Sequence, residues 1–234
     1  MPAGGRLVAF VGRLIPEKGA LRLAQAVQGI PGCTLAVAGT GPEETALAAL
    51  GGGIHALGAL PHEQIVQLLT QADAYCLPTE YAEGFPTTLL EAAACRCPIV
   101  TTRTAGTDEL LPGDDYAVLL ANAAPETIRA GLETLLADPA AARSRAENTR
   151  QNLCSHFTWQ AVFATMMEVV TSAKKELRCQ KLLIVIPAHN EEANIVQVVE
   201  ELTRGYPQYD YVVVNDGSRD KNRGALPRPR LSAH

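Results

Sequence analysis

The sequence contains few aromatic residues, few charged ones and no long apolar run, and each shortage excludes a class of protein. Aromatic side chains make up 5% of the 234 residues and charged side chains 19%, with a net charge of −5. A mildly acidic chain is a poor candidate for nucleic-acid binding, which requires neutralisation of phosphates. The apolar runs are too short to span a bilayer, and the first residues do not resemble a signal peptide. We therefore expect no transmembrane segment, and a protein either free in the cytoplasm or peripheral at the inner face of the membrane.

The sequence also lacks the spacing of a metal site. Its six cysteines include no CxxC pair, and its histidines form neither an HExxH motif nor a paired ligand set. Free cysteines are commonly buried, so we expect buried or half-buried thiols in a reducing compartment. The sequence thus predicts no metal and no cofactor.

Short aliphatic runs alternate with helical patterns through most of the chain. This rhythm predicts strands at 7–11, 34–38, 54–57, 74–77, 99–101 and 116–120, and helices at 20–28, 43–50 and 88–95 and from 61, 125, 140 and 159. Such alternation is typical of an α/β fold with a doubly wound parallel sheet. Ligands of these sheets bind outside the carboxyl ends of the strands. We assign this domain to residues 1–176.

The composition changes after about residue 176. A new strand is expected at 181–186, a helix at about 193–202 and a strand at 211–214, which together predict a short βαβ fragment over 177–220. Residues 221–234 are rich in Arg and Pro and have no periodicity, so we expect a disordered tail.

The loop after the first strand carries two cations between two glycines. Gly12 permits close backbone approach, and Gly19 frees the turn into the next helix. Arg13 and Lys18 stand at the carboxyl end of the strand, where an anion such as a phosphate could sit. Two solvated loop cations are the alternative.

Two carboxylates, Glu83 and Glu91, flank a loop-to-helix junction eight residues apart. The helix start between them offers unpaired N–H groups to a phosphate. Because a diphosphate there would repel both carboxylates, they are expected to bind hydroxyls of a sugar and a ribose. The alternative for Glu91 is structural, since 88–91 has the pattern of a capping box in which Glu91 returns to Thr88.

The segment Gly39-Thr40-Gly41 follows the second strand. It is neither a complete dinucleotide fingerprint nor a Walker A loop. We interpret it first as a tight turn and second as a contact to a base.

The order of these motifs resembles that of a known family. Residues from about 7 to 173 resemble the C-terminal, donor-binding domain of glycosyltransferase family 4, which is the Rossmann-like half of a GT-B fold. The matching motifs are Gly12-Arg13…Glu17-Lys18-Gly19, Ala38-Gly39-Thr40-Gly41-Pro42, Leu57-Gly58, Glu83-Gly84-Phe85-Pro86…Leu90-Glu91-Ala92, Pro98-Ile99-Val100…Ala105-Gly106…Glu109 and Phe157-Thr158-Trp159.

The resemblance implies a role for each motif. Arg13 and Lys18 would grip the diphosphate of a nucleotide-diphosphate sugar, Glu83 would face the transferred sugar, and Glu91 would bind the ribose. Backbone groups of Gly84 and Phe85 and at the helix start, Thr88 and Leu89, would hold sugar and phosphate. Gly39, Gly41 and the segment around Leu57 would border the base, with Gly12 beside the diphosphate. The implied reaction is hexosyl transfer with retained anomeric configuration, in polysaccharide biosynthesis and without a metal.

A GT-B enzyme works in the cleft between two halves, and the N-terminal, acceptor-binding half has no room before Leu7. Catalysis needs both substrates in reacting geometry, so we expect negligible transfer by this chain alone. A non-catalytic sugar-nucleotide-binding remnant and a GT-B-like sugar-nucleotide epimerase are the alternatives.

The segment from 182 to 220 resembles the start of a family 2 glycosyltransferase with the GT-A fold, through Ile186-Pro187-Ala188-His189-Asn190-Glu191-Glu192 and Val214-Asn215-Asp216-Gly217-Ser218. By that resemblance Glu191 and Asp216 would contact a nucleotide, but the expected Asp-x-Asp motif is absent. We expect an inactive fragment, because its two strands have no sheet to join. A truncated or frame-shifted reading frame would account for such a fusion.

Overall fold

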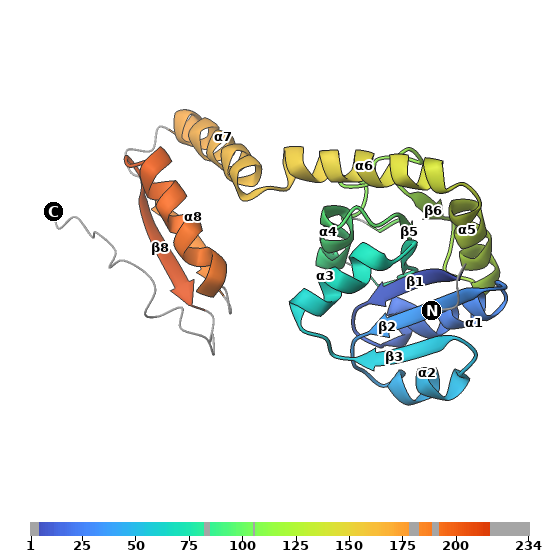
Figure 1. Ribbon diagram of the computed structural model, residues 1–234. Coiled ribbons are helices and arrows are strands. Elements are labelled where there is room, and N and C mark those ends of the chain that lie inside the picture. The colour runs from blue at the N-terminus through green and yellow to red at the C-terminus, as the bar shows by residue number, and fades with distance from the viewer. Residues whose placement is uncertain (1–4, 82–84, 105, 178–182, 189–191, 216–234) are drawn as a thin grey trace. The chain divides into compact units, whose positions relative to one another are not determined.

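The aliphatic run that ends at Val11 forms the central strand of a six-stranded parallel sheet (Figure 1). A computed structural model describes residues 5–81, 85–104, 106–177, 183–188 and 192–215. The order of the strands is β3-β2-β1-β4-β5-β6. Their bounds are β1 Arg6–Val11, β2 Cys33–Ala38, β3 Ile54–Gly58, β4 Ala74–Leu77, β5 Ile99–Thr102 and β6 Val118–Leu120. The predicted doubly wound α/β sheet is therefore confirmed.

The helices cover both faces of this sheet. They are the short 3₁₀ turn η1 Pro16–Lys18, then α1 Ala20–Gln28, α2 Glu44–Leu50, α3 His62–Gln71, α4 Thr87–Ala94, α5 Pro125–Ala137 and α6 Pro139–His156. Helix α1 packs against α2 and α5, whereas α4 packs against α3 and α6. Right-handed crossovers that run outward from β1 to β3 and, on its other side, from β4 to β6 place helices on opposite faces of the sheet.

The sheet is buried because helices lie on both of its faces. Every residue of β1 after Arg6 is buried, as is all of β4 and β5. Continuous apolar runs, rather than alternating ones, are what a parallel sheet of this kind requires. The small side chains of Ala24, Ala92 and Ala93 are fully buried and let helices approach the strands closely.

Residues from Thr158 onward form a second compact unit, separate from the unit that ends at Phe157. It contains α7 Trp159–Leu177, β7 Leu183–Ala188, α8 Glu192–Gly205 and β8 Asp210–Asn215. Strands β7 and β8 pair in parallel, with Ile184 opposite Tyr211. Helix α8 buries Ile195, Val199 and Leu202.

The predicted βαβ fragment is present: its two strands pair with each other and, among the described residues, join no further strand. Helix α7 lies beside α8: the rings of Phe163 and Tyr206 are 5.3 Å apart, and Gln160 Nε2 donates to Glu201 Oε1 at 3.1 Å. In this βαβ unit α8 is thus contacted by a second helix, α7.

Candidate functional site

The candidate site lies at the carboxyl edge of the sheet, where the strand order reverses. The chain leaves β1 toward β2 and β3 but returns on the other side of β1 as β4. The loops that follow β1 and β4 therefore meet. The Glu80 N–H donates to the Glu17 carbonyl at 2.7 Å, and a Cβ on Gly19, whose φ is 77°, would lie 2.5 Å from the Pro78 carbonyl oxygen. Only glycine allows this approach.

The two predicted cations converge on one aromatic ring at this junction. The Arg13 guanidinium carbon and the Lys18 Nζ each lie 5.5 Å from the centre of the Tyr81 ring. Burial lowers the pKa of Lys18, and the nearby charge of Arg13 lowers it further. Two cations held close together favour an anionic ligand, which would relieve their repulsion.

The predicted tight turn after β2 brings its main chain against the loop after β1. A Cβ on Gly41 would lie 2.4 Å from the Leu14 carbonyl oxygen, and Gly39, at φ 144°, makes an even closer approach to Gly12. Main-chain hydrogen bonds from Gly12 N to Ala38 O (3.0 Å) and from Leu14 N to Thr40 O (2.9 Å) join the two loops. The turn itself lies later than predicted, because the bond from Glu44 N to Gly41 O (3.1 Å) closes it over residues 41–44, whereas 39 and 40 run alongside the loop after β1.

A pocket of about 260 Å³ opens at the carboxyl ends of β1, β2 and β3. It gathers three of the predicted residues, Gly12, Arg13 and Gly39, and it is closed on the apolar side by Leu60 and Ile65. Leu57 does not line it and is 42% exposed. A flat, partly apolar group such as a nucleobase suits this lining.

The start of α4 is tied to the end of β1 through a buried tyrosine. The Tyr75 hydroxyl lies 2.7 Å from Thr88 Oγ1 and 3.3 Å from the Val11 carbonyl oxygen. The Leu89 N–H donates to the Pro86 carbonyl at 3.0 Å, so that predicted donor is already used. The ring of Phe85, whose backbone was predicted to contact the ligand, packs on Phe157 at 5.3 Å.

The capping-box alternative for Glu91 was wrong. Helix α4 has Pro86 at its N-cap and no side-chain cap, because it begins one residue earlier than predicted. Glu91 Oε1 lies 3.8 Å from His62 Nδ1, and its Oε2 is buried without a hydrogen-bond partner among the described residues. Burial raises the pKa of this carboxyl, and His62 partly opposes the rise. An unsatisfied buried carboxylate oxygen is costly, and a hydrogen-bond donor brought to it would relieve that cost.

Four predicted residues, Glu83, Gly84, Glu191 and Asp216, lie outside the described residues. Within the described ranges, no group of three or more His, Cys, Asp or Glu side chains is placed to hold a metal ion. Among those same residues, no helix combines the length and the apolar character needed to cross a membrane.

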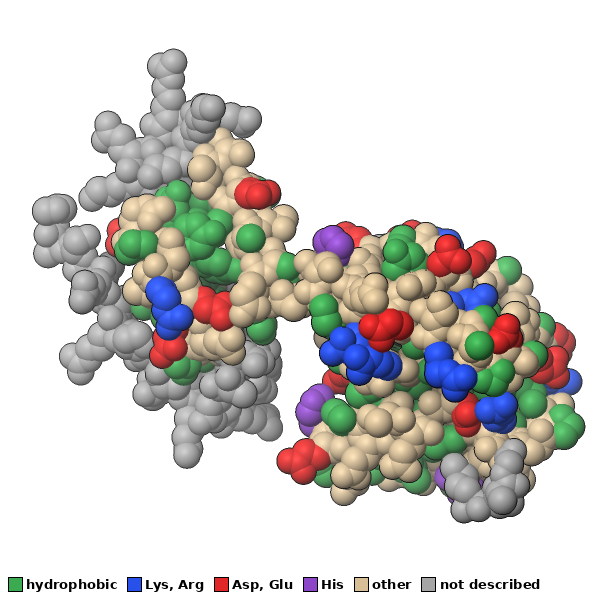
Figure 2. All heavy atoms as spheres, turned by 45° about the horizontal axis from the view of Figure 1, so that its top comes forward, with side chains coloured by type: hydrophobic (Ala, Val, Ile, Leu, Met, Phe, Trp, Pro, Cys, Tyr) green, Lys and Arg blue, Asp and Glu red, His purple; other side chains and the backbone are tan. Residues whose placement is uncertain are grey.

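Acidic and basic side chains are interspersed over the face of the first unit that Figure 2 shows. A broad basic surface, which would indicate nucleic-acid binding, does not occur on the described part of this face. Of the described cysteines, Cys76 and Cys97 are buried, Cys33 and Cys95 are half-buried, and Cys154 is exposed, contrary to its expected burial.

Three residues of the site were missed by sequence reasoning. Tyr75 reads as an ordinary core residue of a strand, and His62 as an ordinary turn residue. Tyr81 could have been predicted. It follows the expected strand 74–77 by four positions, and ligands of parallel sheets bind beyond the carboxyl ends of the strands.

Comparison with known proteins agrees with this architecture. The family model "Glycosyl transferases group 1" matches residues 2–152, and the model "Glycosyl transferase family 2" matches residues 183–226. A glycogen synthase from Mycobacterium tuberculosis is 35% identical over 176 residues, which cover 71% of this chain and 42% of that protein.

Solved structures share the fold. Sucrose-phosphate synthase from Thermosynechococcus elongatus superposes with a TM-score of 0.65 and 25% identity, covering 75% of this chain and 47% of that one. Anabaena HepE in complex with UDP-glucose also has a TM-score of 0.65, at 21% identity over 73% of this chain and 50% of HepE. This chain spans about half the length of these three proteins, and it belongs to the glycosyl transferases group 1 family.

Proposed function

We propose that this chain is the donor-binding half of a retaining hexosyltransferase of glycosyltransferase family 4 and binds a nucleotide-diphosphate sugar. The observation that carries the proposal is the convergence of Arg13 and Lys18 at the switch point of the sheet, beside a pocket bordered by Gly12 and Gly39. A diphosphate between the two cations would place its nucleoside in that pocket.

In this proposal three groups of residues contact the donor. Leu60 and Ile65 would cover one face of the base, and the Glu91 carboxylate, which has an unpartnered oxygen, would accept hydrogen bonds from ribose hydroxyls. Glu83, outside the described residues, follows Tyr81 by two positions and would face the transferred sugar.

Cleavage of the donor leaves a nucleoside diphosphate, on which negative charge develops. In this proposal Arg13 and Lys18 stabilise that charge by hydrogen bonding and Coulomb attraction, so no metal is assigned to the step. The loops that carry Arg13 and Lys18 are joined to their neighbours by main-chain hydrogen bonds. These two cations are therefore positioned before the nucleotide sugar binds.

The acceptor is assigned to a separate, N-terminal half. This assignment is supported by the matched share of the glycogen synthase, of which this chain spans 42%. A donor site without an acceptor site cannot hold both reactants in line, so transfer by this chain alone would be negligible.

The test is calorimetric titration of the full chain with UDP, GDP and their hexose conjugates. Replacing Arg13 with alanine removes a charge-assisted hydrogen bond and should weaken binding about tenfold or more. Arg143→Ala, an equal change of charge beside Arg6 and Asp73 at the opposite edge of the sheet, serves as the control.

Equal affinity of the Arg13→Ala and Arg143→Ala variants for every nucleotide would overturn the proposed site. Addition of an acceptor and an N-terminal half from a relative separates the alternatives. Transfer supports the proposal, binding without turnover favours a remnant, and release of free nucleotide without transfer favours an epimerase.

A further inference from the structure

A pocket lies at the opposite edge of the sheet from the candidate site, where β1, β4 and β5 begin. It has a volume of about 220 Å³. Its lining contains three arginines, Arg6, Arg96 and Arg143, and one carboxylate, Asp73. The apolar part of the lining comes mainly from the end of α5 and the start of α6. We refer to it as the amino-edge pocket.

Arg96 has a backbone conformation that usually requires glycine. Its φ is 54°, and among the described residues it is the only residue other than glycine with a positive φ. Helix α4 ends here in a Schellman motif, because Arg96 N donates to Ala93 O at 3.1 Å and Cys97 N donates to Ala92 O at 2.9 Å. Glycine is the usual residue at this position of the motif. An arginine there is strained, and strained residues concentrate at ligand-binding sites.

The carboxylates that pair with these arginines use only part of their donors. Arg6 Nη1 lies 3.1 Å from Asp73 Oδ1, and Arg96 Nε lies 2.8 Å from Glu147 Oε2. Because an arginine has five N–H donors, both guanidinium groups keep donors for a ligand. Arg143 has no hydrogen-bond or ion-pair partner among the residues that the structure describes. Three cations against two carboxylates leave an excess of one positive charge, which favours an anionic ligand.

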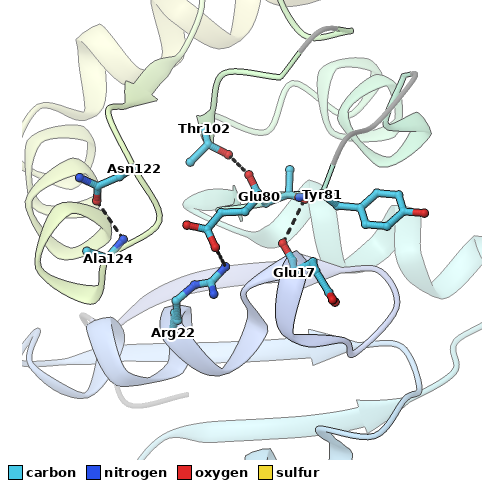
Figure 3. Close-up of polar contacts among 8 residues, drawn as sticks. Glu17, Arg22, Glu80, Tyr81, Thr102, Asn122 and Ala124 are labelled. Atoms are coloured by element: carbon cyan, nitrogen blue, oxygen red, sulfur yellow. Dashed lines mark hydrogen bonds and ion pairs between the residues drawn. The ribbon is translucent and has the colours of Figure 1, made fainter.

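The paired arginines of the amino-edge pocket are open to solvent, unlike an arginine near the other edge of the sheet. The side chain of Arg22, in α1, is 28% exposed, and its Nη2 lies 3.2 Å from Glu80 Oε2 (Figure 3). This pair joins α1 to the loop after β4, which gives Arg22 a structural role. The side chains of Arg6 and Arg96 are 43% and 59% exposed. A ligand can therefore reach both of them.

The wall of the pocket is ordered by bonds to the main chain. Asp73 Oδ2 accepts from the Leu7 N–H at 2.8 Å, and the Asp73 N–H donates to the Leu7 carbonyl, also at 2.8 Å. The carboxylate fixed in this way orients the guanidinium of Arg6. On the apolar side, Leu136 is half-buried and Pro139 is exposed, so both offer surface to a ligand. A ligand would therefore meet charged and apolar groups that are already in place.

From these observations we infer that the amino-edge pocket binds a small organic phosphate monoester. Arg96 and Arg143 would donate to the phosphate oxygens, and the organic group would lie against Leu136 and Pro139. A phosphate suits the pocket better than a carboxylate does, because its three acceptor oxygens can bind donors from separate arginines. The inference does not rest on the proposed function, since the donor site lies at the other edge of the sheet.

The experiment is an NMR titration of the full chain with phenyl phosphate, in which the amide signals of Asp73 and Cys97 should shift and saturate. Arg96→Gly fits the positive φ and should raise the midpoint of thermal unfolding by roughly 2 °C, so this variant stays folded. Its affinity for phenyl phosphate should fall about tenfold, because a charge-assisted hydrogen bond is lost. Arg204→Ala, the same loss of charge at an exposed residue of the second unit, is the control.

A crossed pair of variants separates this pocket from the donor site. Arg143→Ala should weaken the binding of phenyl phosphate but not of UDP, and Arg13→Ala should do the reverse. Inorganic phosphate should bind at least about threefold more weakly than phenyl phosphate, because it makes no apolar contact. Equal phenyl phosphate affinities of Arg96→Gly and Arg204→Ala would overturn the inference. Signal shifts confined to the loops after β1 and β2 would place the phosphate at the donor site and would overturn it as well.

Discussion

A Cβ atom on Gly39 would lie 1.8 Å from the carbonyl oxygen of Gly12, so the two glycines bring the ends of β2 and β1 into main-chain contact. Gly39→Ala should therefore force the loops apart. We expect a loss of more than about 2 kcal/mol in the free energy of unfolding, measured by urea denaturation, together with weaker nucleotide binding.

Gly32→Ala is the matched control for that change. Gly32 also has a positive φ, 71°, but no atom lies within 4 Å of its would-be Cβ. The Gly32→Ala substitution should lower the free energy of unfolding by only about 1 kcal/mol, which is the cost of a positive φ for alanine without a steric clash. Equal losses for both variants would show that the contact between Gly39 and Gly12 is not tight.

Glu91→Gln should raise the stability of the folded chain at neutral pH while it weakens nucleotide binding. Burial raises the pKa of Glu91 above that of a free glutamate, so the ionised form is costly in the folded state. Binding should weaken because the amide loses the negative charge and one of the acceptor oxygens that the ribose hydroxyls would use.

The pH dependence of this gain has a defined sign. Above the folded-state pKa the carboxylate is ionised in both states, and the gain of Glu91→Gln is fully present. As the pH falls from the folded to the unfolded pKa, the folded wild type takes up the proton first and the gain disappears. Thermal unfolding across this range checks it, and a His62→Gln background removes the pairing with His62. A gain that grows on acidification would contradict the assignment.

Tyr75→Phe should cost about 1–2 kcal/mol of unfolding free energy, because it leaves the Thr88 hydroxyl and the Val11 carbonyl without their buried partner. Nucleotide affinity should fall as well, since the start of α4 loses its connection to β1. Tyr116→Phe is the control, because Thr149 bonds to the main chain of Tyr116 and not to its hydroxyl. Urea denaturation of both variants measures the difference, and equal losses would speak against a role for the Tyr75 hydroxyl.

Most of the fold could be predicted because its signals are local. Apolar runs such as 7–11 mark buried strands, and a proline at the first turn, as at Pro125, marks a helix start. The contact of α7 with α8 was not predicted, since it joins segments that lie far apart in the sequence.

The candidate site could be predicted only where glycine and charge patterns stand close together in the sequence. Arg13 and Lys18 belong to one such pattern. Their common contact, Tyr81, lies in the loop after β4, and that loop meets the loop after β1 because the order of the strands reverses at β1. The cap assignment of Glu91 failed for the opposite reason: a local pattern was present, but Tyr75, from a neighbouring strand, lies against Thr88 instead.

The loops after β1 and β2 are joined to each other and to the end of β3 through N–H and C=O groups that every residue except proline possesses. The bonds run from Gly12 N to Ala38 O, from Leu14 N to Thr40 O and from Gly39 N to Gly58 O. Apart from the glycines that permit the approach, the side chains on these loops can be exchanged without loss of a single one of these bonds. Substitutions on these loops can therefore change the chemistry that this edge of the sheet presents while the main-chain framework persists.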